Sequence, residues 1–90
     1  MNKGMDVALT PDEIAELLLQ REDTKKDGGY QSLLVGLQQR VDRATGRLSL
    51  TTEDRERIRR YAFQYGNGGW ENRLVAIFGR TLGPRLDRVS

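Results

Sequence analysis

The chain has 90 residues, of which 37% are hydrophobic and 31% charged, and its formal net charge is +2. This length allows one domain, and the composition is that of a folded protein rather than a disordered one. Cysteine and histidine are absent, which excludes disulfides, thiol nucleophiles, imidazole bases and the usual zinc ligands.

The first twenty residues do not read as a signal peptide, because Asp6, Asp12, Glu13 and Glu16 surround a short apolar patch. The sequence also lacks an apolar run of about 18 residues, the length that a membrane span needs. We therefore expect a cytoplasmic protein that does not enter a membrane.

Helix signals begin at Thr10, which is a suitable N-cap because Pro11 follows it and Glu13 can close a capping box. Leu9 and Ile14 have the spacing of a hydrophobic staple. The apolar stripe continues through Leu17 and Leu18 and fades in the polar stretch 21–27. The first predicted helix therefore starts near Pro11.

A second helix follows Gly28 and Gly29, and Gly46 is its expected end. Its apolar residues recur at helical spacing on one face. They are Tyr30, Leu33, Leu34, Leu37 and Val41. The alternation at Leu48 and Leu50 is too short to predict a strand, so we interpret it as an extended connector over the core.

Thr51 caps a third predicted helix, and Gly66 ends it. Its inward face is expected to hold Ile58, Tyr61, Ala62 and Tyr65. The fourth helix begins at Trp70, ends at Gly83-Pro84 and faces inward with Leu74, Ile77, Phe78 and Leu82. The segments 1–8 and 84–90 are expected to be loose.

The chain contains an internal repeat. Residues 28–40 align without gaps with residues 68–80, and residues 9–13 align with residues 50–54. Identical pairs include Gly28/Gly68, Gly29/Gly69, Leu34/Leu74, Val35/Val75 and Arg40/Arg80. The sequence therefore predicts an all-α fold: a single compact four-helix domain over 1–90, built from two helical hairpins at about 9–46 and 50–83.

Charge is unequal between the two halves. Residues 1–45 hold six basic and eight acidic residues, whereas residues 46–90 hold nine arginines and five acidic residues. The second half is therefore the better candidate for an anionic partner, since arginine binds carboxylates and phosphates in two-point geometry. The other interpretation of the arginines on the third helix, which we favour on charge alone, is a solvated helix face, with Glu53–Arg57 and Glu56–Arg60 as pairs spaced four residues apart.

Aromatic side chains are also concentrated in the second repeat, which holds all of them except Tyr30. Aromatic and arginine residues together are typical of protein-binding hot spots. Phe63 is the best candidate for an exposed ring, because it lies off the inward stripe. The predicted partner-binding residues are Arg55, Arg59, Arg60, Phe63, Arg73 and Arg80.

The paired glycines before the second and fourth helices, Gly28, Gly29, Gly68 and Gly69, are candidate anion-binding turns. The alternative is a tight turn between packed helices, which we favour. The loop 23–34 does not qualify as a calcium loop, because Lys25 and Leu34 replace required oxygen ligands. We predict no metal, cofactor or catalytic residue.

The preferred hypothesis is a non-catalytic helical interaction module that binds a protein partner, for example a partner that belongs to a nucleic-acid-handling complex. The alternative is a small DNA- or RNA-binding regulator, because the third helix, the 66–69 turn and the fourth helix have the proportions of a helix-turn-helix. In that alternative Glu71, Asn72 and Arg73 would read bases.

Overall fold

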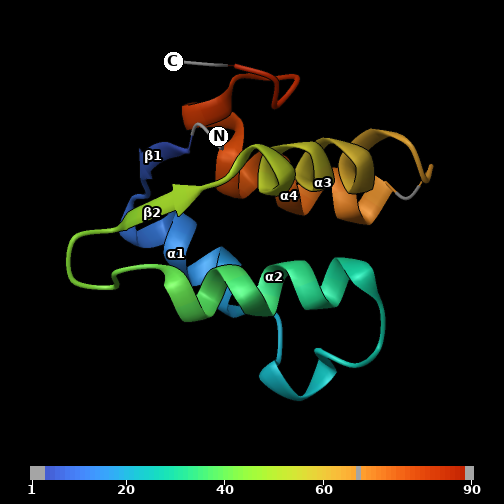
Figure 1. The fold of residues 1–90 in the computed structure, drawn as a ribbon, viewed down its shortest axis with the longest axis horizontal. Coiled ribbons are helices and arrows are strands. Elements are labelled where there is room, and N and C mark those ends of the chain that lie inside the picture. The colour runs from blue at the N-terminus through green and yellow to red at the C-terminus, as the bar shows by residue number, and fades with distance from the viewer. Residues whose placement is uncertain (1–3, 67, 89–90) are drawn as a thin grey trace.

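The computed structural model describes residues 4–66 and 68–88, and this part of the chain is mostly helical with one small antiparallel sheet (Figure 1). In chain order the elements are β1 (Met5–Ala8), α1 (Pro11–Leu18), the short 3-10 helix η1 (Glu22–Thr24), α2 (Gly29–Arg40), β2 (Arg47–Leu50), α3 (Thr52–Phe63) and α4 (Gly68–Leu82). Four α-helices were predicted, and the described residues contain four.

The starts of α1 and α3 have the same local chemistry. The Thr10 side chain accepts a hydrogen bond from the backbone N–H of Glu13, and the Glu13 carboxylate accepts one from the backbone N–H of Thr10. Thr51 and Asp54 form the same reciprocal bonds at α3. Each capping box satisfies two backbone donors that a helix start otherwise leaves unpaired, so both predicted starts are confirmed.

The sheet corrects the prediction of an all-α domain. β1 and β2 pair antiparallel, with Met5 opposite Leu50 and Val7 opposite Leu48. Residues 1–8 were expected to be loose and β2 to be a connector; residues 1–3 lie outside the described residues. Each strand sends only two side chains inward, which is too short an alternation to recognise in a sequence. The pairing partners also lie far apart in the chain.

Gly46 has a different role from the one predicted. Helix α2 ends at Arg40, and Gly46 sits at the entrance to β2, where its carbonyl accepts a hydrogen bond from the Leu9 N–H at 2.9 Å. Its φ is +78°, and a Cβ there would lie 2.1 Å from the Leu9 carbonyl oxygen. Only glycine fits both constraints.

The core is shared by the four α-helices and both strands. Its fully buried side chains include Leu17, Leu34, Leu48, Ile58 and Phe78. Helix α4 packs against both α3 and α1, and α2 packs against α1 and α3. The single core explains the compact dimensions of 29 × 27 × 26 Å.

Residues 84–88, after α4, also differ from the loose tail expected over 84–90, of which residues 89–90 lie outside the described residues. Gly83 ends the helix with φ of +87°, and the chain then folds back so that the Leu86 N–H bonds to the Gly83 carbonyl. Leu86 is 1% exposed and adopts a left-handed φ of 57°. This conformation is costly for leucine, and burial of its side chain offsets the cost.

We predict that the repeat-equivalent leucines Leu34 and Leu74 carry similar stability, because both are fully buried. Leu34→Ala and Leu74→Ala should each lower the free energy of unfolding by about 2 to 5 kcal/mol, measured by urea denaturation. Leu19→Ala is the matched control, since Leu19 is 62% exposed, and it should change stability by less than about 0.5 kcal/mol. Equal effects at all three positions would contradict this core.

Candidate functional site

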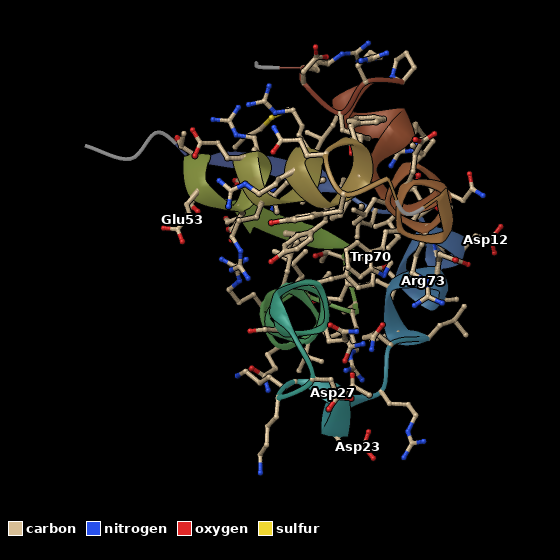
Figure 2. All side chains as sticks on the ribbon, turned by 90° about the vertical axis from the view of Figure 1, so that its right-hand side faces the viewer. Asp12, Asp23, Asp27, Glu53, Trp70 and Arg73 are labelled. Carbon is tan, nitrogen blue, oxygen red and sulfur yellow. The ribbon has the colours of Figure 1, made fainter. Side chains whose placement is uncertain are left out.

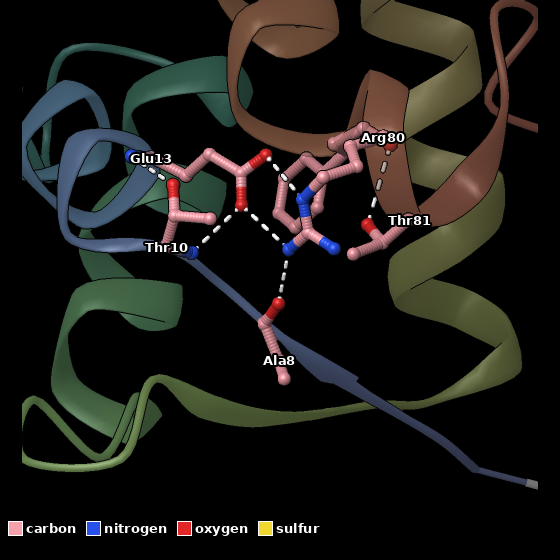
Figure 3. A network of polar contacts seen from close by, with 6 residues as sticks. Ala8, Thr10, Glu13, Arg80 and Thr81 are labelled. Atoms are coloured by element: carbon pink, nitrogen blue, oxygen red, sulfur yellow. Dashed lines mark hydrogen bonds and ion pairs between the residues drawn. The ribbon is translucent and has the colours of Figure 1, made fainter.

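Two ion pairs connect the repeats reciprocally. Arg80 in α4 donates through Nε and Nη2 to the Glu13 carboxylate at 3.1 and 2.9 Å, and Nη2 also bonds to the Ala8 carbonyl (Figure 3). Arg40 at the end of α2 donates to Asp54 at 2.9 Å. Arg40 and Arg80 are aligned in the repeat, as are the two capping acids. Each repeat therefore supplies the arginine that binds the capping acid of the other.

The two capping carboxylates are held in the ionised form. Burial by itself raises the Glu13 pKa, but the Arg80 hydrogen bond, the Thr10 N–H and the Arg80 charge together lower it below its usual value. Burial likewise raises the Asp54 pKa, and the Thr51 N–H and Arg40 outweigh it. These carboxylates are structural anchors of the two helix starts.

A cluster of four rings lies at the end of the molecule where α2 and α4 begin. Tyr30 and Trp70, the aligned aromatics of the repeats, stack at 4.6 Å with an interplanar angle of 10°. Tyr61 packs edge-on against both, at 6.0 and 5.6 Å. Tyr65 stacks on Tyr61 at 5.2 Å. Figure 2 views this end directly and shows Trp70 between the beginnings of the two helices.

The cluster runs from the core to the surface. Tyr30 is 3% exposed, Tyr61 and Trp70 are half-buried, and Tyr65 is 56% exposed. The Tyr30 hydroxyl is buried without a hydrogen-bond partner in the described part of the chain. Burial raises the pKa of Tyr30, and the neighbouring Arg73 charge opposes the shift. We call the outer three rings, Tyr61, Tyr65 and Trp70, the aromatic face.

The two Gly-Gly turns lie at this same end (Figure 1). Gly28 has an extended φ of 165° and caps α2. A Cβ on Gly29 would lie 1.8 Å from the Tyr61 hydroxyl oxygen. Gly29 is therefore required for close contact with a ring, which matches the interpretation of the first turn as a packing turn. Gly68 and Gly69 are exposed in the first turn of α4.

The predicted partner-binding residues do not form one surface. Arg55 and Arg59 line a small hollow beside Arg88, whereas Arg60 is exposed and does not line it. Arg80 is paired with Glu13 of α1. Arg73 is paired with Glu16 of α1 and donates a hydrogen bond to Gln20, which follows that helix. The hollow has a volume of about 110 Å³.

The predicted exposed ring was misplaced. Phe63 is half-buried, packs against the core and lies under the Arg85 guanidinium at 5.1 Å. Tyr65, expected inside, is the exposed ring instead. Helix α3 ends at Phe63, before the end predicted at Gly66. Helical periodicity therefore does not apply to Tyr65.

The expected pairs on α3 are also absent. Within residues 4–66 and 68–88, neither Glu53 with Arg57 nor Glu56 with Arg60 forms a salt bridge. Arg57 donates instead to the Gly29 carbonyl at 3.1 Å. Arg57 therefore joins Tyr61 at the start of α2, a position that the sequence did not indicate.

Over the described residues, no helix combines the length and apolarity of a bilayer span, and His, Cys, Asp and Glu side chains do not gather in threes as metal ligands. Comparison with known proteins gives no match. This holds for family models, curated protein sequences and solved structures. Functional conclusions about this chain therefore depend on its own geometry.

The lowered pKa values of Glu13 and Asp54 predict a specific acid sensitivity. A carboxylate with a lowered folded-state pKa contributes stability above its unfolded pKa, near 4, and that stability is lost as the pH falls through the folded value. Glu13→Gln combined with Asp54→Asn should therefore flatten the fall in stability between about pH 5 and pH 2, measured by urea denaturation. An unchanged pH dependence would mean that other carboxylates control acid unfolding.

Proposed function

We propose that this chain is a non-catalytic interaction module that binds a protein partner through the aromatic face. The observation that carries the proposal is the exposed Tyr65 ring, which one neighbouring ring stacks against while 56% of its surface remains open. Tyr, Trp and Arg are the residues that dominate protein-binding hot spots. Arg57 lies beside Tyr61, since both contact Gly29.

Rigidity of the aromatic face supports the same role. Tyr61 is held between Gly29 and the Trp70 edge, and Trp70 is held by the stack with Tyr30. Because these side chains are already held in place, binding a partner costs little of their conformational entropy. The face is therefore organised before binding, which favours affinity.

The two buried carboxylates, Glu13 and Asp54, support a non-catalytic role. Glu13 and Asp54 have lowered pKa values and already bind arginines and backbone N–H groups. A general acid or base works best with a pKa near the operating pH. These two carboxylates are committed to capping and cross-linking.

The helix-turn-helix alternative has weaker support. Its second helix would be α4, but Arg73 is bonded to Gln20 and Arg80 is paired with Glu13. Glu71 is exposed at the start of α4, where it would repel phosphates. Exposed Arg59 and Arg60 on α3 keep nucleic acid as an outcome of the test below.

We also propose that the chain consists of two strand–helix–helix units related by an approximate two-fold axis. Three reciprocal features support it: the pairing of the aligned Val7 and Leu48, the stack of Tyr30 on Trp70, and the crossed arginine–carboxylate pairs. Superposition of residues 5–40 on 46–80 in an experimental structure tests this arrangement.

The functional test is quantitative partner capture with Tyr65→Ala. We expect capture from the native cell extract to fall about tenfold or more, because truncation of a hot-spot aromatic costs about 2 kcal/mol. Helical content and melting temperature should stay close to those of the original chain, since Tyr65 lies on the surface. Leu19→Ala, an exposed apolar residue beyond the end of α1, is the matched control.

Two results would overturn the proposal. If Tyr65→Ala captures the same proteins as the original chain, the aromatic face is not the binding surface. If nuclease treatment of the extract removes all captured proteins, nucleic acid is the ligand. Salt titration with duplex and single-stranded probes then measures that alternative, because phosphate contacts weaken steeply with salt.

A further inference from the structure

A groove runs between α2 and α3 and ends near the aromatic face. It has a volume of about 340 Å³ and is lined by Lys25, Ser32, Gly36, Gln39, Arg40 and Arg57. A Cβ placed on Gly36 would meet no atom within 4 Å, so this part of the wall is open. Arg57 bonds to Gly29, and Tyr61 lies against the same glycine, which connects the groove to the aromatic face.

In the repeat, α1 corresponds to α3 and α2 to α4, so the boundary between α1 and α4 is equivalent to this groove. Side-chain contacts cross that boundary. There Arg73 reaches across from α4, donating to Gln20 Oε1 at 3.1 Å and lying 3.9 Å from Glu16. In the alignment, Arg73 corresponds to Leu33, and Glu16 corresponds to Arg57. Leu33 cannot reach across as an arginine does, and Arg57 brings a positive charge where the other boundary has a negative one.

The charges that line the groove favour an anionic occupant. Lys25, Arg40 and Arg57 face a single acid, Asp54, which is already bonded to Arg40 and caps α3. The side chains of Lys25, Ser32 and Gln39 make no hydrogen bond within the described residues. The groove therefore offers a surplus of cations together with unused polar groups.

We propose that this groove binds an acidic peptide segment of the protein partner. Lys25 and Arg57 pair with its carboxylates, and Ser32 and Gln39 hydrogen-bond to its backbone. Arginine and lysine clusters are a recurring means of binding acidic motifs. The proposal rests on the proposed function, because the groove leads to the aromatic face.

A peptide fits the charges better than a nucleic acid strand does. A phosphodiester chain gains its affinity by neutralising several phosphates in succession. Here the cations are interrupted by acids: Asp54 lines the groove, Glu53 is exposed next to it, and Asp27 is exposed two residues after Lys25. A short segment with a few carboxylates can pair with Lys25 and Arg57 alone, and the charge of Asp54 is already neutralised by Arg40.

The test uses the full chain and fluorescently labelled peptides of alternating aspartate and glutamate, with an asparagine and glutamine peptide of equal length as the uncharged probe. We expect the acidic peptide to bind and Arg57→Glu to weaken its binding about tenfold or more, since loss of a charge-assisted contact and added repulsion act together. Arg59→Glu is the matched control, because it makes the same charge change on α3 outside the groove, and its effect should stay within about threefold.

Backbone amide shifts supply a readout of location. On titration with the acidic peptide, the largest shifts should fall at Ser32, Gly36 and Gln39, and circular dichroism should show that each variant keeps its helices. Equal weakening by Arg57→Glu and Arg59→Glu would overturn the proposal, since it indicates general electrostatic attraction. Failure of the acidic peptide to bind would overturn it as well.

Two further outcomes separate this inference from the proposed function. If a single-stranded oligonucleotide binds more tightly than the peptide and depends on Arg57, the groove holds phosphates and the peptide proposal is wrong. If Tyr65→Ala abolishes partner capture while Arg57→Glu leaves it unchanged, the aromatic face remains the partner site and only the groove assignment fails.

Discussion

The structure depends on a contact between a helix start in one repeat and an arginine at the far end of the other. Glu13 and Asp54 each close a capping box and, with the same carboxylate, bind Arg80 or Arg40. One acidic side chain therefore caps the start of its own helix and holds the last turn of a distant helix against it. Replacing it by an apolar residue would leave a backbone donor without its partner and would remove the carboxylate that pairs with the guanidinium.

The reciprocal contacts also explain why the two Gly-Gly-aromatic turns lie at one end. The strands pair at one side of the molecule, and the crossed ion pairs orient α2 and α4 so that both begin at the opposite side (Figure 1). Tyr30 and Trp70 then meet face to face. Tyr65 packs on the outside of this stack, against Tyr61 and edge-on to Trp70, and is therefore the exposed ring of the cluster.

Local chemistry was readable from the sequence, and long-range partners were not. Thr10 and Thr51 marked two helix starts correctly because a capping box involves residues only three positions apart. The strands were missed because each is stabilised by pairing with the other, as Val7 is with Leu48, and the two are far apart in the sequence. Arg73 and Arg80 were predicted to bind a partner, whereas in the structure they bond to Gln20 and Glu13. The residues next to them in the sequence give no sign of these distant contacts. Tyr65 was assigned to the core because helical periodicity was extended past the end of α3.

The crossed pairs impose an order on how the chain acquires its structure during synthesis. Glu13 and Arg80 are 67 residues apart, and Asp6 and Ser49, which bond between the strands, are 43 apart. A ribosome must therefore release α4 before the first helix receives its arginine. Until then the capping carboxylate of the first repeat is exposed to water, whereas β1 can pair earlier, once β2 has been released. Contacts between residues so far apart in the sequence slow folding. The start of α1 is therefore fully stabilised only after α4 has formed and supplied Arg80.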